Sequence, residues 1–446
     1  MFFGDAMLEM LNKSVWAIAT TMIILSGVYF SKKFGFVQFR FKEMFLNLFK
    51  KDKKERGISP IQSFLMTLGS RIGVGSIAGV SLALYLGGPG SVFWMWISAF
   101  ISAPNTFCET ILGIVYREKD GNNFKGGPSY YIRNGLGKPK LGKVYAIIIL
   151  VSFVGGFVGI QGNTITKSLL EIVSIPKEII GIVLVCLVSL IVFGGLKRIA
   201  SFSEKLVPFM TILYVGIALF VAVKNISLVP RIFWTIISSA FQWKSIYGGF
   251  VGSLIIGVQR GIFSNEAGLG TGSITSSTSS TDSPTSQGYI QMLGIYVTTL
   301  LICTATVIIV MTSNYSELVL NDVNGIEITQ HAFKFHLGDF GNLLLFLSVL
   351  LFSFTTILTG YYDGESSLKY LFHNLKSKHL SALKITSLIL LFVGCVLPSE
   401  TLWSFVDILM ALLAIINIYA IFALKDDVKE ELRCYNSTKY DKISKR

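Results

Sequence analysis

Two glycine-rich interruptions of long apolar segments constrain this chain more than any other feature of its sequence. The stretch Gly261–Gly270 reads Gly-Ile-Phe-Ser-Asn-Glu-Ala-Gly-Leu-Gly and lies inside the apolar segment 248–280. The stretch Gly69–Gly79 reads Gly-Ser-Arg-Ile-Gly-Val-Gly-Ser-Ile-Ala-Gly and interrupts the apolar segment 60–85. Such polar and flexible backbone is tolerated at membrane depth only where it lines a cavity or is buried in protein. Two interrupted helices in matching positions of two halves predict the substrate site of a secondary transporter.

The composition is typical of a multi-span membrane protein. Of the 446 residues, 52% are hydrophobic and 15% are charged, whereas soluble proteins carry about 25% charged residues. Apolar runs of roughly 20 residues, enough to cross a bilayer as helices, predict an all-α membrane protein with about 11 transmembrane helices. The leading apolar run lacks a basic leader and a cleavage site, so we expect an uncleaved helix. The expected spans are 14–30, 60–85, 91–116, 144–173, 178–196, 206–223, 248–280, 289–312, 341–368, 383–397 and 402–424.

The positive charge fits a membrane protein better than a nucleic-acid-binding one. The formal net charge is +13, but the chain has no zinc-ligand spacing and no repeat of basic and aromatic residues. Thirty of the 39 Lys and Arg residues fall in loops on one side of the expected spans, and seven fall on the other side. Cytoplasmic loops collect basic residues. The sequence therefore predicts a cell-membrane (inner-membrane) protein whose N-terminus lies outside and whose C-terminus is cytoplasmic.

The ten spans after the leading helix divide into two halves of five. Because five is odd, the second half must cross the membrane in the opposite sense to the first, as in inverted-repeat transporters. The expected parts are a leading helix and basic segment, a first repeat, an outer connection, a second repeat and a charged tail, at 1–59, 60–223, 224–247, 248–424 and 425–446. The outer loop before span 341–368 carries a helical pattern over 326–337, which predicts a lid helix.

Interrupted helices expose unpaired N–H groups at one half-helix and unpaired C=O groups at the other. The N–H end attracts anions and the C=O end attracts cations, so a zwitterionic amino acid with a sodium ion suits both ends. In the first break, the carbonyls from Gly73 to Ser76 are the candidate contacts. The alternative is that these small residues only let helices pack closely.

Polar side chains in and near the second break are further candidates. Ser264, Asn265 and Glu266 form its polar centre, and an intramembrane carboxylate is a functional candidate by default. Glu266 can bind a cation, carry a proton, or form a structural salt bridge with Arg71 or Arg260. Each of these two arginines is expected either to cap a half-helix or to take part in a gate.

Two other spans place polar groups near mid-membrane. Ser353, Thr355 and Thr356 offer hydroxyls that, with backbone carbonyls, suit a hard cation such as Na⁺, although threonines also bond to their own helix. Gln161 follows a glycine-rich run, and its buried amide requires a partner. That partner is expected to be either the ligand or a neighbouring helix.

At these residues the chain resembles the alanine or glycine:cation symporter family, within the amino acid–polyamine–organocation group. The matching blocks occur in the family's order and extend over nearly the whole chain after Phe34. The Ser-Asn-Glu-Ala-Gly block is the most specific of them. The blocks are Gly73–Gly79 with Leu86–Gly90 and Phe93–Trp96, Gly126–Ile132, Arg260–Gly270, Phe354–Leu358 with Tyr361, Tyr362, Gly364 and Glu365, and Trp403 with Asp407.

The resemblance implies a leucine-transporter-like fold of five-plus-five inverted repeats with one extra N-terminal helix. It also implies Na⁺- or H⁺-coupled uptake of a small neutral amino acid such as alanine or glycine, without enzymatic activity or a cofactor, by a protein expected to be a monomer. The expected substrate-binding residues are Gly73, Val74, Gly75, Ser76, Gln161, Phe263, Ser264, Asn265, Gly268 and Gly360. The expected sodium ligands are Gly73, Ser76, Thr355 and Thr356, and the expected coupling or gating residues are Glu266, Arg71 and Arg260.

The chain departs from the family pattern at four places. Ser76 and Met410 stand where the family usually has Asn, and Gly360 stands where it often has Trp. Thr271-Gly272-Ser273 replaces a small-Ala-Pro sequence. These departures leave a larger or more polar amino acid open as the substrate. A channel or sensor is a weaker alternative, because a channel requires a continuous polar stripe rather than breaks at mid-depth.

Overall fold

The computed structural model describes residues 2–49, 56–242, 249–281, 283–372, 375–397 and 400–444. These residues are almost entirely helical, and among them seven helices are long and apolar enough to cross a membrane. The all-α, multi-pass prediction is therefore confirmed. The count of eleven spans stays a prediction, since it also depends on the shorter, interrupted helices. Residues 243–247 of the expected connection and 445–446 of the expected tail lie outside the described ranges.

The first half contains the first helix break where the sequence predicts it. The leading helix α1 spans Phe2–Lys33, longer than expected, and α2 spans Phe41–Leu48. The segment 60–85 forms two helices with a 3-10 turn between them. The elements are α3 Pro60–Arg71, η2 Val74–Ser76, α4 Ala78–Gly87, α5 Pro89–Val115, α6 Pro128–Asn134, α7 Pro139–Ile149, the π-helix η3 Leu150–Phe157, α8 Val158–Leu170, α9 Lys177–Val192 and α10 Gly195–Lys224.

The second half contains the second break between α12 and α13. The lid helix α17 has the predicted bounds, whereas α19 begins six residues earlier than expected and the charged tail is helical. The elements are α11 Val229–Ser239, α12 Gly249–Asn265, α13 Thr271–Ser276, α14 Pro284–Tyr296, the π-helix η4 Val297–Cys303, α15 Thr304–Met311, α16 Tyr315–Leu320, α17 Ile326–Leu337, α18 Asp339–Leu371, α19 Ser377–Val396, α20 Glu400–Ala423 and α21 Lys425–Ser444.

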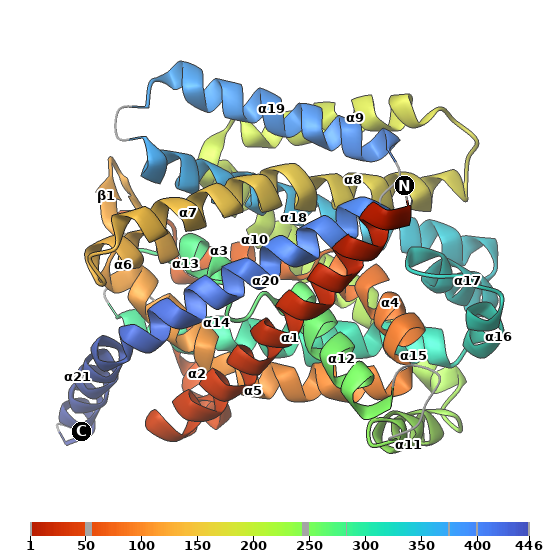
Figure 1. The fold of residues 1–446 in the computed structure, drawn as a ribbon, viewed down its shortest axis with the longest axis horizontal. Coiled ribbons are helices and arrows are strands. Elements are labelled where there is room, and N and C mark those ends of the chain that lie inside the picture. The colour runs from red at the N-terminus through yellow and green to blue at the C-terminus, as the bar shows by residue number, and fades with distance from the viewer. Residues whose placement is uncertain are drawn as a thin grey trace.

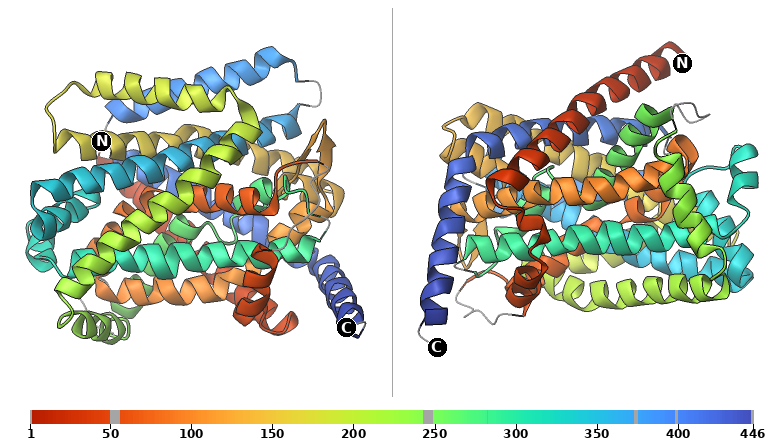
Figure 2. Two further views of the ribbon diagram at one scale, coloured as in Figure 1. Left: turned by 180° about the vertical axis from the view of Figure 1, so that it is seen from behind. Right: turned by 90° about the horizontal axis from the view of Figure 1, so that it is seen from below.

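Corresponding helices of the two halves lie against each other. The second spans α5 and α14 pack together, as do α8 and α18 from the third spans and α9 and α19 from the fourth. The α9–α19 pair forms an outer layer of the molecule (Figures 1 and 2). The extra helix α1 lies along α20, and α21 projects away from the bundle (Figure 1). This pairing leaves the interrupted helices between α5 and α14 on one side and α8 and α18 on the other.

A short hairpin closes one end of the bundle and was not predicted. Strand β1, Glu118–Asp120, pairs antiparallel with β2, Asn123–Lys125. Beside it, Ile58 forms a parallel bridge with Ser279. The backbone N–H of Ile58 donates to Thr278 O at 3.1 Å, and Ser280 N–H donates to Ile58 O at 2.8 Å. The entry to α3 is thus tied to the chain that follows α13.

Candidate functional site

The first break follows a well-capped helix, α3, that ends at Arg71. Ser59 and Gln62 form a reciprocal capping box and Pro60 occupies the first helical position, so α3 starts firmly. A side chain at Gly73 would place its Cβ 2.5 Å from Thr356 Oγ1. Glycine is therefore required there, because the backbone approaches α18 too closely for any other residue.

The second break is a run of left-handed backbone. Glu266 has φ +56°, Gly268 has φ +82° and Gly270 has φ +94°. The glycines adopt this conformation without strain, whereas a non-glycine residue there costs about 1–3 kcal/mol. Such strain persists where the surroundings over-determine it and is common at functional sites. Glu266 is therefore a strained non-glycine residue within the second break.

Glu266 joins the two breaks. Its Oε1 accepts a hydrogen bond from Ser70 Oγ at 2.9 Å, in the last turn of α3. Its Oε2 accepts from Thr271 Oγ1 at 2.6 Å, in the first turn of α13. The side chain is 1% exposed. The Glu266 carboxylate is thus bound by two hydroxyl groups. Arg260, one of its two expected salt-bridge partners, pairs with Asp407 instead.

The breaks also touch directly. Ser76 Oγ and Ser264 Oγ lie 2.8 Å apart, and a Cβ at Gly75 would be 2.9 Å from the Phe263 ring. Asn265 instead holds its own turn: its Oδ1 accepts from Ala267 N–H at 2.9 Å and its Nδ2 donates to Thr299 Oγ1 at 2.9 Å. The structure therefore brings the two predicted gaps together as one enclosed centre.

Gln161 reaches this centre from α8. Its Oε1 accepts from Val74 N–H at 3.1 Å, inside the first break. Among the described residues, its Nε2 has no hydrogen-bond partner although the side chain is fully buried. A buried amide with unmet donors is expected to bind water or a ligand. The hydroxyl of Ser353, on α18, is likewise buried without a partner among the described residues.

The two threonines of α18 meet the carbonyls at the end of α3. Thr355 Oγ1 donates to Gly69 O at 2.9 Å, and Thr356 Oγ1 lies 3.1 Å from both Gly69 O and Ser70 O. Hydroxyl and carbonyl oxygens are the ligands that a hard cation prefers. The carbonyls come from Gly69 and Ser70, earlier in the chain than the expected Gly73 and Ser76. Gly73 lies against Thr356, but the Ser76 hydroxyl lies with Ser264.

A buried ion pair and a group of stacked aromatic rings, both formed between α12 and α20, lie next to this centre. Arg260 forms a salt bridge with Asp407 of α20, and both side chains are under 5% exposed. Gln259 Nε2 also donates to Asp407, at 2.9 Å. The Phe263 ring stacks on Trp403 at 4.9 Å and contacts Phe157 at 5.3 Å between ring centroids. Arg260 thus pairs with α20, which is distant from α12 in the sequence.

Arg71, in the last turn of α3, is buried, and so are several carboxylates. Arg71 Nη1 donates to Gln291 O at 2.9 Å, and its Nε and Nη2 have no partner among the described residues. Glu109, Asp363 and Asp407 are buried as well, each exposed by 3% or less. The sequence did not mark these three as buried, because their burial depends on which helices pack around them.

Two expected substrate contacts lie at the margin. Gly268 O accepts from Asn417 Nδ2 at 2.9 Å, and the Gly268 backbone faces Asn105 and Ile418 rather than Gln161. Gly360 follows Thr356 by one turn of α18. A Cβ there would lie 3.7 Å from Phe153 O and from Val158. Gly360 therefore faces the π-helix η3, beside the centre, and leaves room for a small side chain.

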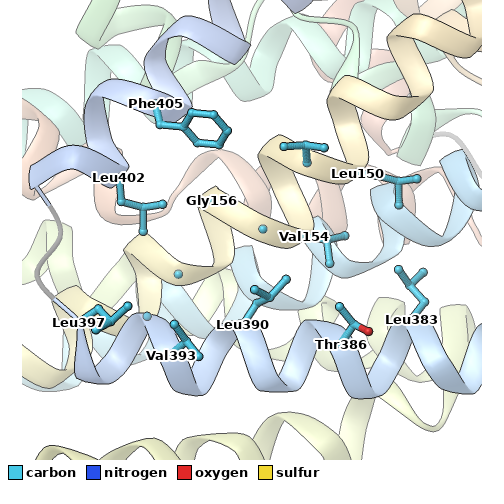
Figure 3. A pocket seen from close by; sticks show the side chains of 14 residues that line it. Leu150, Val154, Gly156, Leu383, Thr386, Leu390, Val393, Leu397, Leu402 and Phe405 are labelled. Atoms are coloured by element: carbon cyan, nitrogen blue, oxygen red, sulfur yellow. The ribbon is translucent and has the colours of Figure 1, made fainter. Parts of the chain in front are cut away.

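An apolar groove of about 720 Å³ lies behind η3, on the far side from the breaks. Its walls are α19 and α20 and its floor is glycine-rich (Figure 3). Wall residues such as Leu397 and Phe405 are 54% and 41% exposed, as expected of side chains facing lipid. The groove is therefore separate from the polar centre. Its lining residues are Leu150, Val151, Val154, Gly155, Gly156, Gly159, Leu383, Thr386, Leu390, Val393, Gly394, Leu397, Leu402 and Phe405.

Comparisons with known proteins agree with this geometry. The model of the sodium:alanine symporter family matches residues 1–446. The chain is 36% identical over 426 residues to the amino-acid carrier protein AlsT of Bacillus subtilis, covering 95% of this chain and 90% of AlsT. It is 31% identical over 445 residues to the sodium/alanine symporter AgcS of Methanococcus maripaludis, covering 97% of both chains. It is also 35% identical over 433 residues to the probable sodium/glutamine symporter GlnT of Bacillus subtilis, covering 96% of this chain and 90% of GlnT.

A solved structure has the same fold. The crystal structure of MhsT in complex with L-phenylalanine superposes with a TM-score of 0.61 at 12% identity, covering 83% of this chain and 89% of MhsT. The predicted leucine-transporter-like fold is confirmed by this likeness. The relatives are named as carriers and symporters, so the protein is a cation-coupled amino-acid symporter and not an enzyme. By family model and by sequence identity, this chain belongs to the sodium:alanine symporter family.

Proposed function

We propose that the protein imports a small neutral amino acid, alanine or glycine in size, together with Na⁺, by alternating access. The observation that carries this proposal is the junction of the two breaks. Glu266 of the second break bonds to Ser70 of the first, and Ser70 also supplies a carbonyl to Thr356. Ser70 of α3 therefore contacts both the Glu266 carboxylate, which joins the two breaks, and the hydroxyl of Thr356. A cation there and a solute between the breaks would bind to the same backbone.

The proposed substrate site lies between Val74, Gly75, Phe263 and Ser264, with Gln161 on its third side. A half-helix N-terminus suits the carboxylate of an amino acid, and a C-terminus suits its ammonium group. The unpaired Nε2 of Gln161 supplies a further donor toward this space. The proposed sodium ligands are Thr355, Thr356 and the carbonyls of Gly69 and Ser70.

Two closures bound the centre and would open in turn. We assign the outer one to the Arg260–Asp407 pair with the Phe263–Trp403 stack. We assign the inner one to the bridge between Ile58 and Ser279. With this assignment the N-terminus would lie outside and the C-terminus in the cytoplasm, which is the orientation that we propose from the basic loops. In this conformation the centre is closed on both sides, since Gln161, Ser264 and Glu266 are at most 1% exposed.

A larger or more polar amino acid is the second candidate substrate. Gly360 leaves space beside the centre, and a Cβ there meets nothing closer than 3.7 Å. One relative is named as a probable sodium/glutamine symporter. A glutamine-sized side chain would require that space, whereas alanine would not.

Uptake by proteoliposomes tests both candidates. Purified protein is assayed with a panel of labelled amino acids under an imposed Na⁺ or H⁺ gradient. We expect accumulation of alanine or glycine that requires inward Na⁺ and collapses when the gradient is dissipated. The Glu266→Gln variant should stay extractable and folded while its uptake falls. If no amino acid accumulates under either gradient, the proposal is wrong, and accumulation of glutamine in preference to alanine selects the second candidate.

A further inference from the structure

A polar stripe runs along one face of α18 from the threonine pair toward the inner closure. Thr356, Thr359, Asp363 and Ser367 follow one another at helical spacings of three or four residues, so they share a face. All four are buried. Asp363 follows Thr356 by seven residues, which places it about 10 Å further along the helix. The stripe ends where Ser366 and Ser367 line a narrow void with Ile274 and Ser129.

The opposite wall of this stripe is α3, which runs antiparallel to α18. Thr355 and Thr356 meet the carbonyls of Gly69 and Ser70, and one turn further Thr359 Oγ1 lies 3.3 Å from Met66 O. Residues further along α18 therefore contact residues nearer the start of α3. Asp363 lies one more turn along α18. There it interacts with Thr275, on α13.

The hydrogen bonding of the Asp363 carboxyl group is incomplete. The side chain is 1% exposed, and its Oδ1 has no hydrogen-bond partner among the described residues. A carboxylate in the membrane is costly and is retained where it serves an ion pathway or a partner. A purely structural aspartate would be expected to have both oxygens bonded. The open oxygen therefore points to a ligand.

The local charge favours a cation as that ligand. Asp363 interacts electrostatically with Glu266, and Arg71 interacts with Glu266 and Glu109. Three carboxyl groups thus share this region with one guanidinium, and a cation bound beside them would favour their ionised form. The carboxyl group of Asp363 and the hydroxyls of Thr275 and Thr359 are oxygens of the kind that a hard monovalent cation prefers.

We propose that Asp363 is a relay ligand that receives the coupling Na⁺ from the threonine pair and releases it toward the cytoplasm. This inference rests on the proposed function, because it requires a coupled cation at Thr355 and Thr356. The relay acts after the solute has bound, when the inner closure opens. It affects cation release and leaves amino-acid recognition between the breaks unchanged.

Net uptake and exchange separate these roles. Net uptake driven by a Na⁺ gradient needs the cation to leave on the inside in every cycle. Exchange of labelled for unlabelled amino acid, with saturating Na⁺ on both sides, does not. For Asp363→Asn we expect net uptake to fall about tenfold, the effect of losing one charge-assisted ligand. Exchange should stay within about twofold of the wild-type rate in the same experiment.

Three variants make the outcome decisive. Asp363→Glu keeps the charge and should restore net uptake. Asp363→Ser removes the charge and leaves a smaller side chain. If Asp363→Asn does not fold, Asp363→Ser takes its place in both assays. Ser348→Ala on the same helix, where the hydroxyl bonds only to Leu344 O at 2.8 Å, should change neither rate. An equal fall of net uptake and exchange, or no change in either, overturns the relay. If the wild-type protein shows neither net uptake nor exchange, the proposed function itself fails.

Discussion

At the scale of single residues, the proposed cation site depends on Thr355 and Thr356. Their hydroxyls lie within 3.1 Å of the Gly69 and Ser70 carbonyls. Replacing both by alanine removes two oxygens from the proposed cation site and leaves the substrate contacts at Gln161 untouched. We expect the Na⁺ concentration for half-maximal uptake to rise at least about tenfold. A sodium titration of uptake measures this, and an unmoved curve would place the cation site elsewhere.

The Arg260–Asp407 pair supports a second prediction, about stability. Removing one partner of a buried pair leaves the other charge uncompensated, which costs about 3–5 kcal/mol. Asp407→Asn should therefore lower the melting temperature of the detergent-solubilised protein markedly. The matched control is Asp426→Asn, because Asp426 pairs with Lys33 at the surface and is 75% exposed. Surface pairs contribute little, so equal shifts for the two variants would show that the buried pair does not stabilise the protein more than a surface pair does.

Single residues also show where sequence reasoning stops. Glu266, Gln161 and the threonine pair could be predicted because glycines or neighbouring hydroxyls marked their segments. Asp363 and Glu109 could not, since burial depends on which helices pack around them. The partner of Arg260 was equally hidden: Asp407 lies 147 residues away, and their pairing depends on α20 packing near α12. A sequence identifies which groups require a partner, but packing decides which partner they find.

At the scale of elements, Arg117 contacts the segment that we assign to the inner closure. It lies just after α5, and its guanidinium donates to Ser277 O at 3.2 Å, Ser279 O at 2.5 Å and Thr281 O at 3.1 Å. These carbonyls belong to the segment that bridges to Ile58. Removing the guanidinium should loosen both strands of the bridge, because three buried or half-buried carbonyls lose their donor.

Arg117→Ala is therefore expected to shift the protein toward an inward-open state. Hydrogen–deuterium exchange should speed up in 56–60 and 277–281 while remaining unchanged in the outer half. Arg133→Ala is the control, because Arg133 lies near the same hairpin but pairs with Glu118. If the two variants exchange alike, Arg117 does not hold the closure.

The lid helix α17 supports a prediction about pH. His336 packs under the lid with its Nε2 3.0 Å from Thr312 Oγ1 and from Ile309 O. Burial lowers the pKa of His336 below its ordinary value of 6.5. The docked lid therefore favours neutral histidine, whereas the undocked lid takes up a proton first as the pH falls. Docking should weaken progressively below the ordinary pKa.

Hydrogen–deuterium exchange of residues 326–337 at pH 5.5 and 7.5 measures this effect, after correction for intrinsic exchange rates. Faster corrected exchange at the lower pH is expected in the wild-type protein and should disappear in His336→Gln. His331 is exposed on the same helix, so His331→Gln should retain the pH effect. A lid with the same protection at both pH values would show that His336 does not control docking.

Elements differ in how far the sequence predicts them. The bounds of α17 and the positions of both breaks follow from helical periodicity and glycine placement. The π-helices η3 and η4 do not, because a π segment requires only a local extra residue that tertiary packing stabilises. The hairpin β1–β2 was also missed, since its strands have three residues each and no clear alternation.

At the scale of the whole molecule, the predicted odd number of spans in each half would explain how two similar breaks face each other. Inversion places the N-terminal half-helix of one break beside the C-terminal half-helix of the other. This arrangement was predictable from hydropathy and the parity of the spans. Its packing was not, because the pairing of α5 with α14 and of α9 with α19 depends on surfaces that periodicity alone does not define.

The central claim is that the two breaks form one site. Ser76 and Ser264 represent the two sides, with their hydroxyl oxygens 2.8 Å apart. In a Cys303→Ala background, which removes the neighbouring thiol 3.2 Å from Ser264, the pair Ser76→Cys and Ser264→Cys should form a disulfide under mild oxidation. The most direct measurement is the rate of this crosslinking with and without saturating amino acid and Na⁺. We predict ready crosslinking that the two ligands together slow. Failure to crosslink, or the same rate with both ligands bound, would contradict a shared site.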